Sequence, residues 1–179
     1  MSSDVMVDLE TMGRVAGCAI LSIGAVRFDR ERQELGDEFY EVVRLDSCLE
    51  AGLHEDPDTA AWWAKQSAEA QRVLTQARRT RGNLKLATAL KRFNEYLGTG
   101  VYLWGNGADF DNAILQHACW RVGVTPAWDF WRNRCYRTYK GLVPQVKAAR
   151  SGTHHNALDD AKTQAEHALR IYRELHGRP

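Results

Sequence analysis

The first residues of the chain alternate between polar and apolar side chains. Over residues 4–9 the odd-numbered positions are apolar and share one side of a predicted strand, whereas Asp8 and Glu10 lie on the other side. The apolar runs at 19–28 and 38–44 predict two further strands, and the polar residues between them predict a turn. Three successive strands of this kind predict an antiparallel meander.

Apolar residues recur at helical spacing through much of the remaining chain. Residues 84–97 show this spacing and are followed by Gly98, which is typical of a helix end. Residues 101–104 form a short apolar strand that leads into a glycine turn. The other segments are an irregular stretch at 46–58 with a turn at 56–58, a helix in one or two pieces at 59–79, and helices at 109–122, 127–146 and 156–175. This order predicts one α/β domain over residues 1–179, with a mixed β-sheet flanked by α-helices.

Composition excludes several classes of protein. The chain is 44% apolar and 26% charged, which is ordinary for a soluble domain. Its N-terminus is acidic and unlike a signal peptide, and no window approaches the roughly 18 apolar residues of a membrane span. The cysteines form no CxxC pair; they are Cys18, Cys48, Cys119 and Cys135. We expect reduced thiols in a cytoplasmic protein with no membrane partner, rather than a disulfide framework or a zinc site.

Charge is distributed unevenly along the chain, although the net charge is only +1. Residues 1–60 hold 5 Lys or Arg and 14 Asp or Glu, a net charge of −9. Residues 61–150 hold 15 Lys or Arg and 5 Asp or Glu, a net charge of +10. An acidic segment that binds metal and a basic segment that faces phosphates would suit an enzyme that acts on a polyanion. The alternative is that these charges are simply solvated.

The first candidate motif is the pair Asp8 and Glu10. Two residues apart on a strand, both carboxylates lie on one face, where they could hold one metal ion and bridge to a second. Hard oxygen ligands favour Mg²⁺ or Mn²⁺ over zinc. Taken alone, such a pair more often marks a solvent-facing strand surface.

The second motif places Asp111 in the first turn of a helix, after a short strand and a glycine turn. Sites of α/β proteins are built at this carboxyl end of a strand. Acidic residues are also favoured at helix N-termini by capping and by the helix dipole, and Asp109 could serve as such a cap. Asp111 therefore has both a functional and a purely structural interpretation.

The third motif is His155 and Asp160, five residues apart at the start of the last predicted helix. A histidine in the preceding loop and an aspartate in the second turn can face one cleft. His154 and Asp159 have the same spacing, so the spacing leaves both pairs open. A helix start rich in acids that follows loop histidines is the alternative interpretation.

Together, the segments VDLETMG, AILSIGAVRFD, WGNGADFDNAIL and HHNALDDA resemble the DEDDh branch of the 3′–5′ exonucleases, most closely its phage and bacterial members. The resemblance runs from about residue 5 to residue 172 and is looser in the helical middle. It implies a ribonuclease H-like fold, in which the antiparallel meander continues into parallel strands.

The resemblance also implies roles for individual residues. Asp8, Glu10, Asp111 and Asp160 would bind two ions of Mg²⁺ or Mn²⁺, and His155 would be the general base that deprotonates the attacking water. The family pattern HxAxxDA favours the pair His155 and Asp160 over its neighbours. The products would be nucleoside 5′-monophosphates from the 3′ end of single-stranded DNA or RNA, and a homodimer is expected by analogy.

Other residues are candidates for substrate contacts. By resemblance, Leu9 and Thr11 would line the pocket of the terminal nucleotide. Aromatic rings can stack on bases, although at least one of Trp62 and Trp63 is expected in the core. The full set of aromatic candidates is Trp62, Trp63, Trp104, Trp128 and Trp131. A basic run could contact phosphates or form a solvated helix face; it comprises Arg132, Arg134, Arg137 and Lys140.

Two other functions compete with exonucleolysis. A phosphoesterase for small nucleotides would need neither the basic segment nor its aromatic residues. A non-catalytic nucleic-acid-binding module would not need all five motif positions. The motifs therefore favour the exonuclease but do not distinguish DNA from RNA, because that choice depends on contacts to the 2′-hydroxyl.

Overall fold

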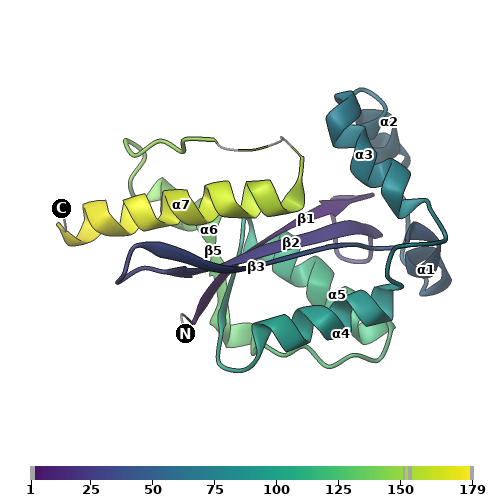
Figure 1. Ribbon diagram of the computed structural model, residues 1–179, viewed down its shortest axis with the longest axis horizontal. Coiled ribbons are helices and arrows are strands. Elements are labelled where there is room, and N and C mark those ends of the chain that lie inside the picture. The colour runs from purple at the N-terminus through teal and green to yellow at the C-terminus, as the bar shows by residue number, and fades with distance from the viewer. Residues whose placement is uncertain (1–2, 151, 153–154, 178–179) are drawn as a thin grey trace.

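A five-stranded mixed sheet forms the centre of the protein. The computed structural model describes residues 3–150, 152 and 155–177. The strand order is β3-β2-β1-β4-β5, with β1 and β2 and then β2 and β3 antiparallel, and β4 and β5 parallel to β1 (Figure 1). The strands are β1 (Asp4–Thr11), β2 (Ile20–Asp29), β3 (Glu34–Val42), β4 (Tyr102–Gly105) and β5 (Asn133–Cys135). The meander and the mixed sheet predicted from the sequence are confirmed.

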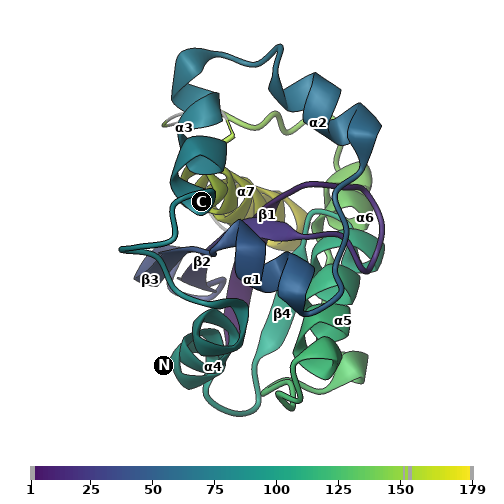
Figure 2. The same ribbon diagram turned by 90° about the vertical axis from the view of Figure 1, so that its right-hand side faces the viewer.

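Helices cover both faces of the sheet. α4 and α5 lie on one face and α7 on the other, while α1, α2 and α3 gather at one end (Figures 1 and 2). The α-helices are α1 (Leu45–Glu50), α2 (Pro57–Trp63), α3 (Ala68–Ala77), α4 (Leu86–Leu97), α5 (Ala113–Arg121), α6 (Tyr136–Gly141) and α7 (Ala157–His176). A π-helical turn, η1 (Ala108–Asn112), precedes α5, and a 3₁₀ turn, η2 (Phe130–Arg132), precedes β5.

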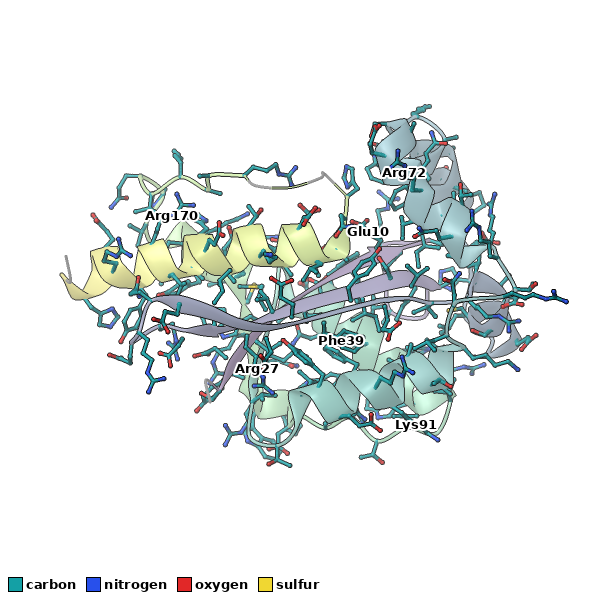
Figure 3. All side chains as sticks on the ribbon, viewed as in Figure 1. Glu10, Arg27, Phe39, Arg72, Lys91 and Arg170 are labelled. Carbon is teal, nitrogen blue, oxygen red and sulfur yellow. The ribbon has the colours of Figure 1, made fainter. Side chains whose placement is uncertain are left out.

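The alternation of β1 separates two hydrophobic cores. Val5, Val7 and Leu9 belong to the larger core, beneath α4 and α5, and Met6 belongs to the smaller core, beneath α7. Phe39 of β3 points toward α4, where its ring lies 5.3 Å from that of Phe93 (Figure 3). Because both faces are packed, β1 is fixed from both sides, and its two carboxylates emerge at one end of the smaller core.

The structure corrects two predicted segments. The single helix expected over 127–146 is replaced by η2, β5 and the short α6, because parallel pairing with β4 overrides the local helical pattern. The stretch at 46–58 was expected to be irregular, yet α1 begins at Leu45 and α2 at Pro57. Asp56 caps α2 by accepting a hydrogen bond from the Thr59 amide, so the expected turn is a helix start.

The close approach of α7 to the sheet depends on Gly24 of β2. Gly24 pairs with Asp8 of β1 and lies directly beneath the first residues of α7. A Cβ atom added at Gly24 would lie 2.2 Å from the backbone carbon of Ala157 and 2.2 Å from the amide nitrogen of Leu158. A glycine at this position therefore lets the N-terminal end of α7 lie against the strand pair that carries Asp8.

We expect Gly24→Ala to push the start of α7 away from β1 and β2. Overlap with backbone cannot be relieved by a side-chain rotation, so the free energy of unfolding should fall by about 2 kcal/mol or more, and the melting temperature by about 5 °C or more. Circular dichroism melting measures this. Gly141→Ala is the matched control, because its added Cβ meets nothing within 4 Å. Equal melting temperatures for the two variants would contradict the tight contact.

Candidate active site

The strand β1 presents Asp8 and Glu10 on one face, as the alternation predicted, and α7 covers that face. Glu10 is buried and Asp8 is partly exposed. In Figure 3, Glu10 lies next to the N-terminal end of α7. Both carboxylates thus reach the end of the sheet at which α7 begins.

Asp111 reaches the same place from the π-helical turn η1 after β4. Its Oδ1 accepts a hydrogen bond from the Leu9 amide (3.2 Å), and its Oδ2 accepts one from the Asn106 amide (2.8 Å). Gly105 makes room for it, since a Cβ there would lie 2.9 Å from the Asp111 Cβ. The carboxylate is buried and tied to β1 by the backbone, so it is a fixed part of the site rather than a solvent-facing helix start.

The start of α7 supplies His155 and Asp160. Asn156 caps the helix by accepting hydrogen bonds from the amides of Leu158 and Asp159, and His155, just before it, has a positive φ of 61°. That conformation is uncommon for a residue with a side chain and is more frequent for histidine than for most. One ligand atom from each of Glu10, His155 and Asp160 lies within 4.8 Å of the others. Residues from the two ends of the chain therefore converge.

The neighbouring pair of the same spacing is placed differently. Asp159 lies beside Gly152, whose added Cβ would be 2.4 Å from the Asp159 carboxyl carbon. His154 lies outside the described residues. Of the two aspartates, Asp160 is the one that lines the cavity with Glu10.

Crowding of these carboxylates changes their acidity. Burial raises the pKa of Glu10 to about 8, and the charges of Asp160 and Asp111 add to the shift. Burial also raises the pKa of Asp111 to about 7 against the effect of its backbone hydrogen bonds, and it raises the pKa of Asp8 well above its usual value. Burial lowers the pKa of His155. A cluster of like charges out of water is costly unless a cation joins it.

Gln164 is a site residue that we did not predict. Its amide donates a hydrogen bond of 2.7 Å to Oδ1 of Asp8, and it lines the same cavity. Gln164 follows Asp160 by four residues on α7, so the helical period places both side chains on one face. That spacing was available in the sequence and could have identified it.

Two adjoining cavities share Leu9 and Glu10. The first, of about 520 Å³, is polar; its walls include Asp8, Glu10, His155, Asp160, Gln164, Lys140 and Arg150. The second, of about 450 Å³, is largely apolar; its walls include Leu9, Thr11, Trp62, Trp63 and Phe110. A flat apolar group can therefore lie beside the carboxylate cluster.

Most of the aromatic candidates separate into core and surface residues. Trp63 is 1% exposed, and its indole donates to the Thr11 carbonyl, so it forms the base of the apolar cavity. Trp62 is 42% exposed, and its ring lies edge-on to the His155 ring, 5.0 Å away. Trp128 is buried beneath α4, and Trp131 is 63% exposed outside both cavities. The expectation that at least one of the adjacent tryptophans is a core residue is confirmed for Trp63.

The structure corrects the expectation that Trp104 contacts substrate. Trp104 is 4% exposed, packs edge-on against Phe28 in the smaller core, and donates its indole hydrogen to Asp4. A ring covered in this way offers no face to a base. Arg137 is exposed beside Gly107, near the turn that leads to Asp111, but lines neither cavity.

The donor set fits hard divalent cations. Carboxylate oxygens suit Mg²⁺ and Mn²⁺, and burial, together with the charges of neighbouring carboxylates, raises the pKa values of Asp8 and Glu10. The three donors of Glu10, His155 and Asp160 are close enough together to share an ion. A mixed sheet flanked by helices, with carboxylates gathered at this edge, is the arrangement that the motifs predicted for a nuclease.

Comparison with known proteins identifies the family. Residues 3–172 match the model of the family described as the 3′-5′ exoribonuclease Rv2179c-like domain, and the chain belongs to this family. The 3′-5′ exonuclease activity that the motifs predicted is thereby confirmed. A search of curated protein sequences gave no match.

Solved structures share the fold at low sequence identity. The nuclease domain of 3′hExo, a DEDDh family member bound to rAMP, is 16% identical over 96% of this chain and 92% of its own, with a TM-score of 0.64. Exonuclease X with 5′ overhanging duplex DNA is 16% identical over 97% and 93%, with a TM-score of 0.60. E. coli Exonuclease I with a dA16 oligonucleotide is 14% identical over 98% of this chain but 43% of its own, with a TM-score of 0.69. The ribonuclease H-like fold is thereby confirmed.

Two further findings concern the other sequence-based expectations. Cys18, Cys48, Cys119 and Cys135 are all free thiols, as predicted. Among the described residues, no helix is both long and apolar enough to cross a lipid bilayer.

We expect the metal-free protein to lose stability as the pH rises from about 5 to about 8. The unfolded chain releases the Glu10 proton near its ordinary pKa of 4.5, whereas the folded protein keeps it to about 8. The folded state then binds more protons in this window, so the free energy of unfolding falls with rising pH. Asp111 acts in the same direction, and His155, with its lowered pKa, acts in the opposite one.

Melting temperatures measured across this pH window, with EDTA and with Mn²⁺, test the expectation. Mn²⁺ should restore the stability lost at the higher pH, and Glu10→Gln should flatten the pH dependence in EDTA. Glu55→Gln, at an exposed position, is the control and should retain it. A melting temperature in EDTA that stays level or rises with pH would contradict the charge crowding.

Proposed function

We propose that this exonuclease hydrolyses single-stranded RNA from its 3′ end and releases nucleoside 5′-monophosphates. The observation that carries the proposal is the convergence of Glu10, His155 and Asp160 within 4.8 Å, beside an apolar cavity. RNA is favoured over DNA because the family is described as exoribonucleases and because 3′hExo was solved with rAMP bound. The homodimer and the cytoplasmic location expected from the sequence stay predictions.

We assign Asp8, Glu10, Asp111 and Asp160 as the ligands of two divalent cations, Mg²⁺ or Mn²⁺. Such ions lower the pKa of a bound water and stabilise the leaving oxygen of a phosphodiester. Backbone amides hold Asp111, and Gln164 holds Asp8. These hydrogen bonds orient two carboxylates from separate elements, β1 and η1, before any substrate binds.

We assign His155 as the general base. Burial lowers its pKa, so the imidazole is neutral near pH 7 and can accept the proton of the attacking water. Its ring lies against the edges of Trp62 and Trp63, which restricts its orientation. The nearby Asp160 carboxylate would then stabilise the imidazolium that forms.

The apolar cavity would take the 3′-terminal nucleoside. Leu9 lies between Asp8 and Glu10, and Thr11 directly follows Glu10, so a nucleoside bound against Leu9 and Thr11 would have its phosphate near the carboxylates. Trp62 offers an exposed ring to the base, and Trp63 supports it from below. Arg137, exposed near the same edge, would contact the phosphate backbone further along the strand.

We expect His155→Asn to lower kcat by about 10²–10⁴-fold, because the water loses its proton acceptor. Asp160→Asn should abolish activity by removing a metal ligand. Ladders from 5′-labelled single-stranded RNA and DNA, in Mg²⁺, Mn²⁺ or EDTA, measure both effects. His176→Asn, at the far end of α7, and Asp159→Asn are the matched controls and should keep activity.

The outcomes separate the competing functions. Metal-dependent shortening of RNA from its 3′ end, lost in Asp160→Asn but not in Asp159→Asn, would support the proposal. Equal or faster shortening of DNA would overturn the choice of RNA. Hydrolysis of dinucleotides alone would favour the small-nucleotide phosphoesterase, and binding without turnover would favour the non-catalytic module.

We expect Trp62→Ala to raise KM for single-stranded RNA by about 5- to 100-fold, with a smaller change in kcat, because stacking on one base contributes about 1–3 kcal/mol. Trp131→Ala removes a ring that is still more exposed but lies outside both cavities, and it should leave KM unchanged. Steady-state kinetics on one RNA measures both. A similar KM in the wild type, Trp62→Ala and Trp131→Ala would argue against base stacking at Trp62.

A further inference from the structure

An arginine outside the exonuclease motifs reaches into the carboxylate cluster. Nη2 of Arg150 donates to Oδ1 of Asp160 at 2.7 Å. The Asp160 side chain is 13% exposed and that of Arg150 is 44% exposed, so the pair lies at the mouth of the polar cavity. The other oxygen, Oδ2, accepts a hydrogen bond from the His155 amide at 3.2 Å. Both oxygens of Asp160 are therefore engaged.

The segment that carries Arg150 is anchored to α7. Residues 142–150 leave α6 and run beside α7 toward its first turn (Figure 1). The Val146 carbonyl lies 2.8 Å from Nε2 of His167, and Nδ1 of His167 lies 2.6 Å from the Tyr136 hydroxyl. Because a carbonyl only accepts, Nε2 carries the hydrogen and Nδ1 accepts from Tyr136. This buried chain of hydrogen bonds holds the segment four residues before Arg150.

The ion pair would compete with a metal ion for Asp160. A cation that takes Oδ1 of Asp160 as a ligand would lie at contact distance from the Arg150 guanidinium, and like charges at that distance repel. The guanidinium must leave Oδ1 when a metal ion binds there. Since the segment is anchored at Val146, Arg150 stays in the wall of the cavity that it shares with Asp8, Lys140 and Gln164.

We propose that Arg150 alternates between two partners: it neutralises Asp160 in the metal-free protein, and it binds the phosphate of the 3′-terminal linkage once metal has displaced it. A planar guanidinium can donate two parallel hydrogen bonds to phosphate oxygens, which suits this second role. The phosphate-binding half rests on the proposed function. The ion-pair half rests on the geometry of the metal-free protein alone.

Two equilibrium measurements test the two halves without turnover. Calorimetric titration with Mn²⁺ in the absence of RNA should show that Arg150→Gln binds Mn²⁺ about 3- to 10-fold more tightly than the wild type, because the competing cation is gone. Fluorescence anisotropy of a 5′-fluorescein single-stranded RNA, with Ca²⁺ present, should show that Arg150→Gln binds the RNA at least about 10-fold more weakly than the wild type does. Arg150→Lys should keep a near-wild-type Mn²⁺ affinity and an intermediate RNA affinity.

Lys140→Gln is the matched control for charge. It removes one positive charge from the same cavity, but Nζ of Lys140 lies over the Tyr136 ring rather than at Asp160. An equal gain in Mn²⁺ affinity for Lys140→Gln would assign the effect to the general field of the cavity and overturn the specific pair. Unchanged or weaker Mn²⁺ binding by Arg150→Gln, with an unchanged melting temperature, would also overturn it.

The RNA measurement decides the second half. Unchanged RNA affinity in Arg150→Gln would overturn the phosphate contact. Failure of the exonuclease proposal appears differently, as a wild-type protein that leaves RNA intact in Mg²⁺ and Mn²⁺. The Mn²⁺ titration would still decide the ion pair in that case, so the two failures are distinguishable.

Discussion

The contact between the first turn of α7 and the strand pair β1–β2 is the constraint on which the site depends. Gly24 leaves room for the backbone of Ala157 and Leu158, and this brings His155 and Asp160 next to Glu10. Without that approach, the carboxylates of β1 and those of α7 would belong to separate surfaces. The site is therefore assembled by backbone packing between elements almost 150 residues apart, and the local sequence around each motif only supplies the side chains.

The two hydrophobic cores supply the free energy that holds like charges together. The cores on either side of β1 fix the strand, and the amides of Leu9 and Asn106 fix Asp111. Burial and mutual repulsion then raise the pKa of Glu10 to about 8. A cluster that is strained in this way favours any cation that enters it, whether a divalent ion or the guanidinium of Arg150. On the proposed function, the fold thus prepares the site for cations before any cation binds.

Much of the fold, and the place of the carboxylates of β1 in it, could be predicted because the sequence repeats apolar residues with the periods of strands and helices. The alternation of β1 placed Asp8 and Glu10 on one face, and the meander and α7 followed from period-2 and helical patterns. The fifth strand was missed because Asn133–Cys135 is three residues long and is a strand only through pairing with β4. Trp104 was misplaced because an aromatic residue before a glycine turn has the same pattern whether it faces a core or a cleft. Arg150 carries no local signal, since only the path of residues 142–150 brings it to Asp160.

The central claim is that Asp8, Glu10, Asp111 and Asp160 together hold divalent cations. Anomalous diffraction from crystals grown with Mn²⁺ tests it most directly, because the scattering locates the ions without reference to activity. The account predicts two Mn²⁺ peaks in the polar cavity, within coordination distance of these carboxylates, and fewer peaks in Asp160→Asn crystals. Mn²⁺ bound only elsewhere on the protein, with Arg150 still paired to Asp160, would contradict it.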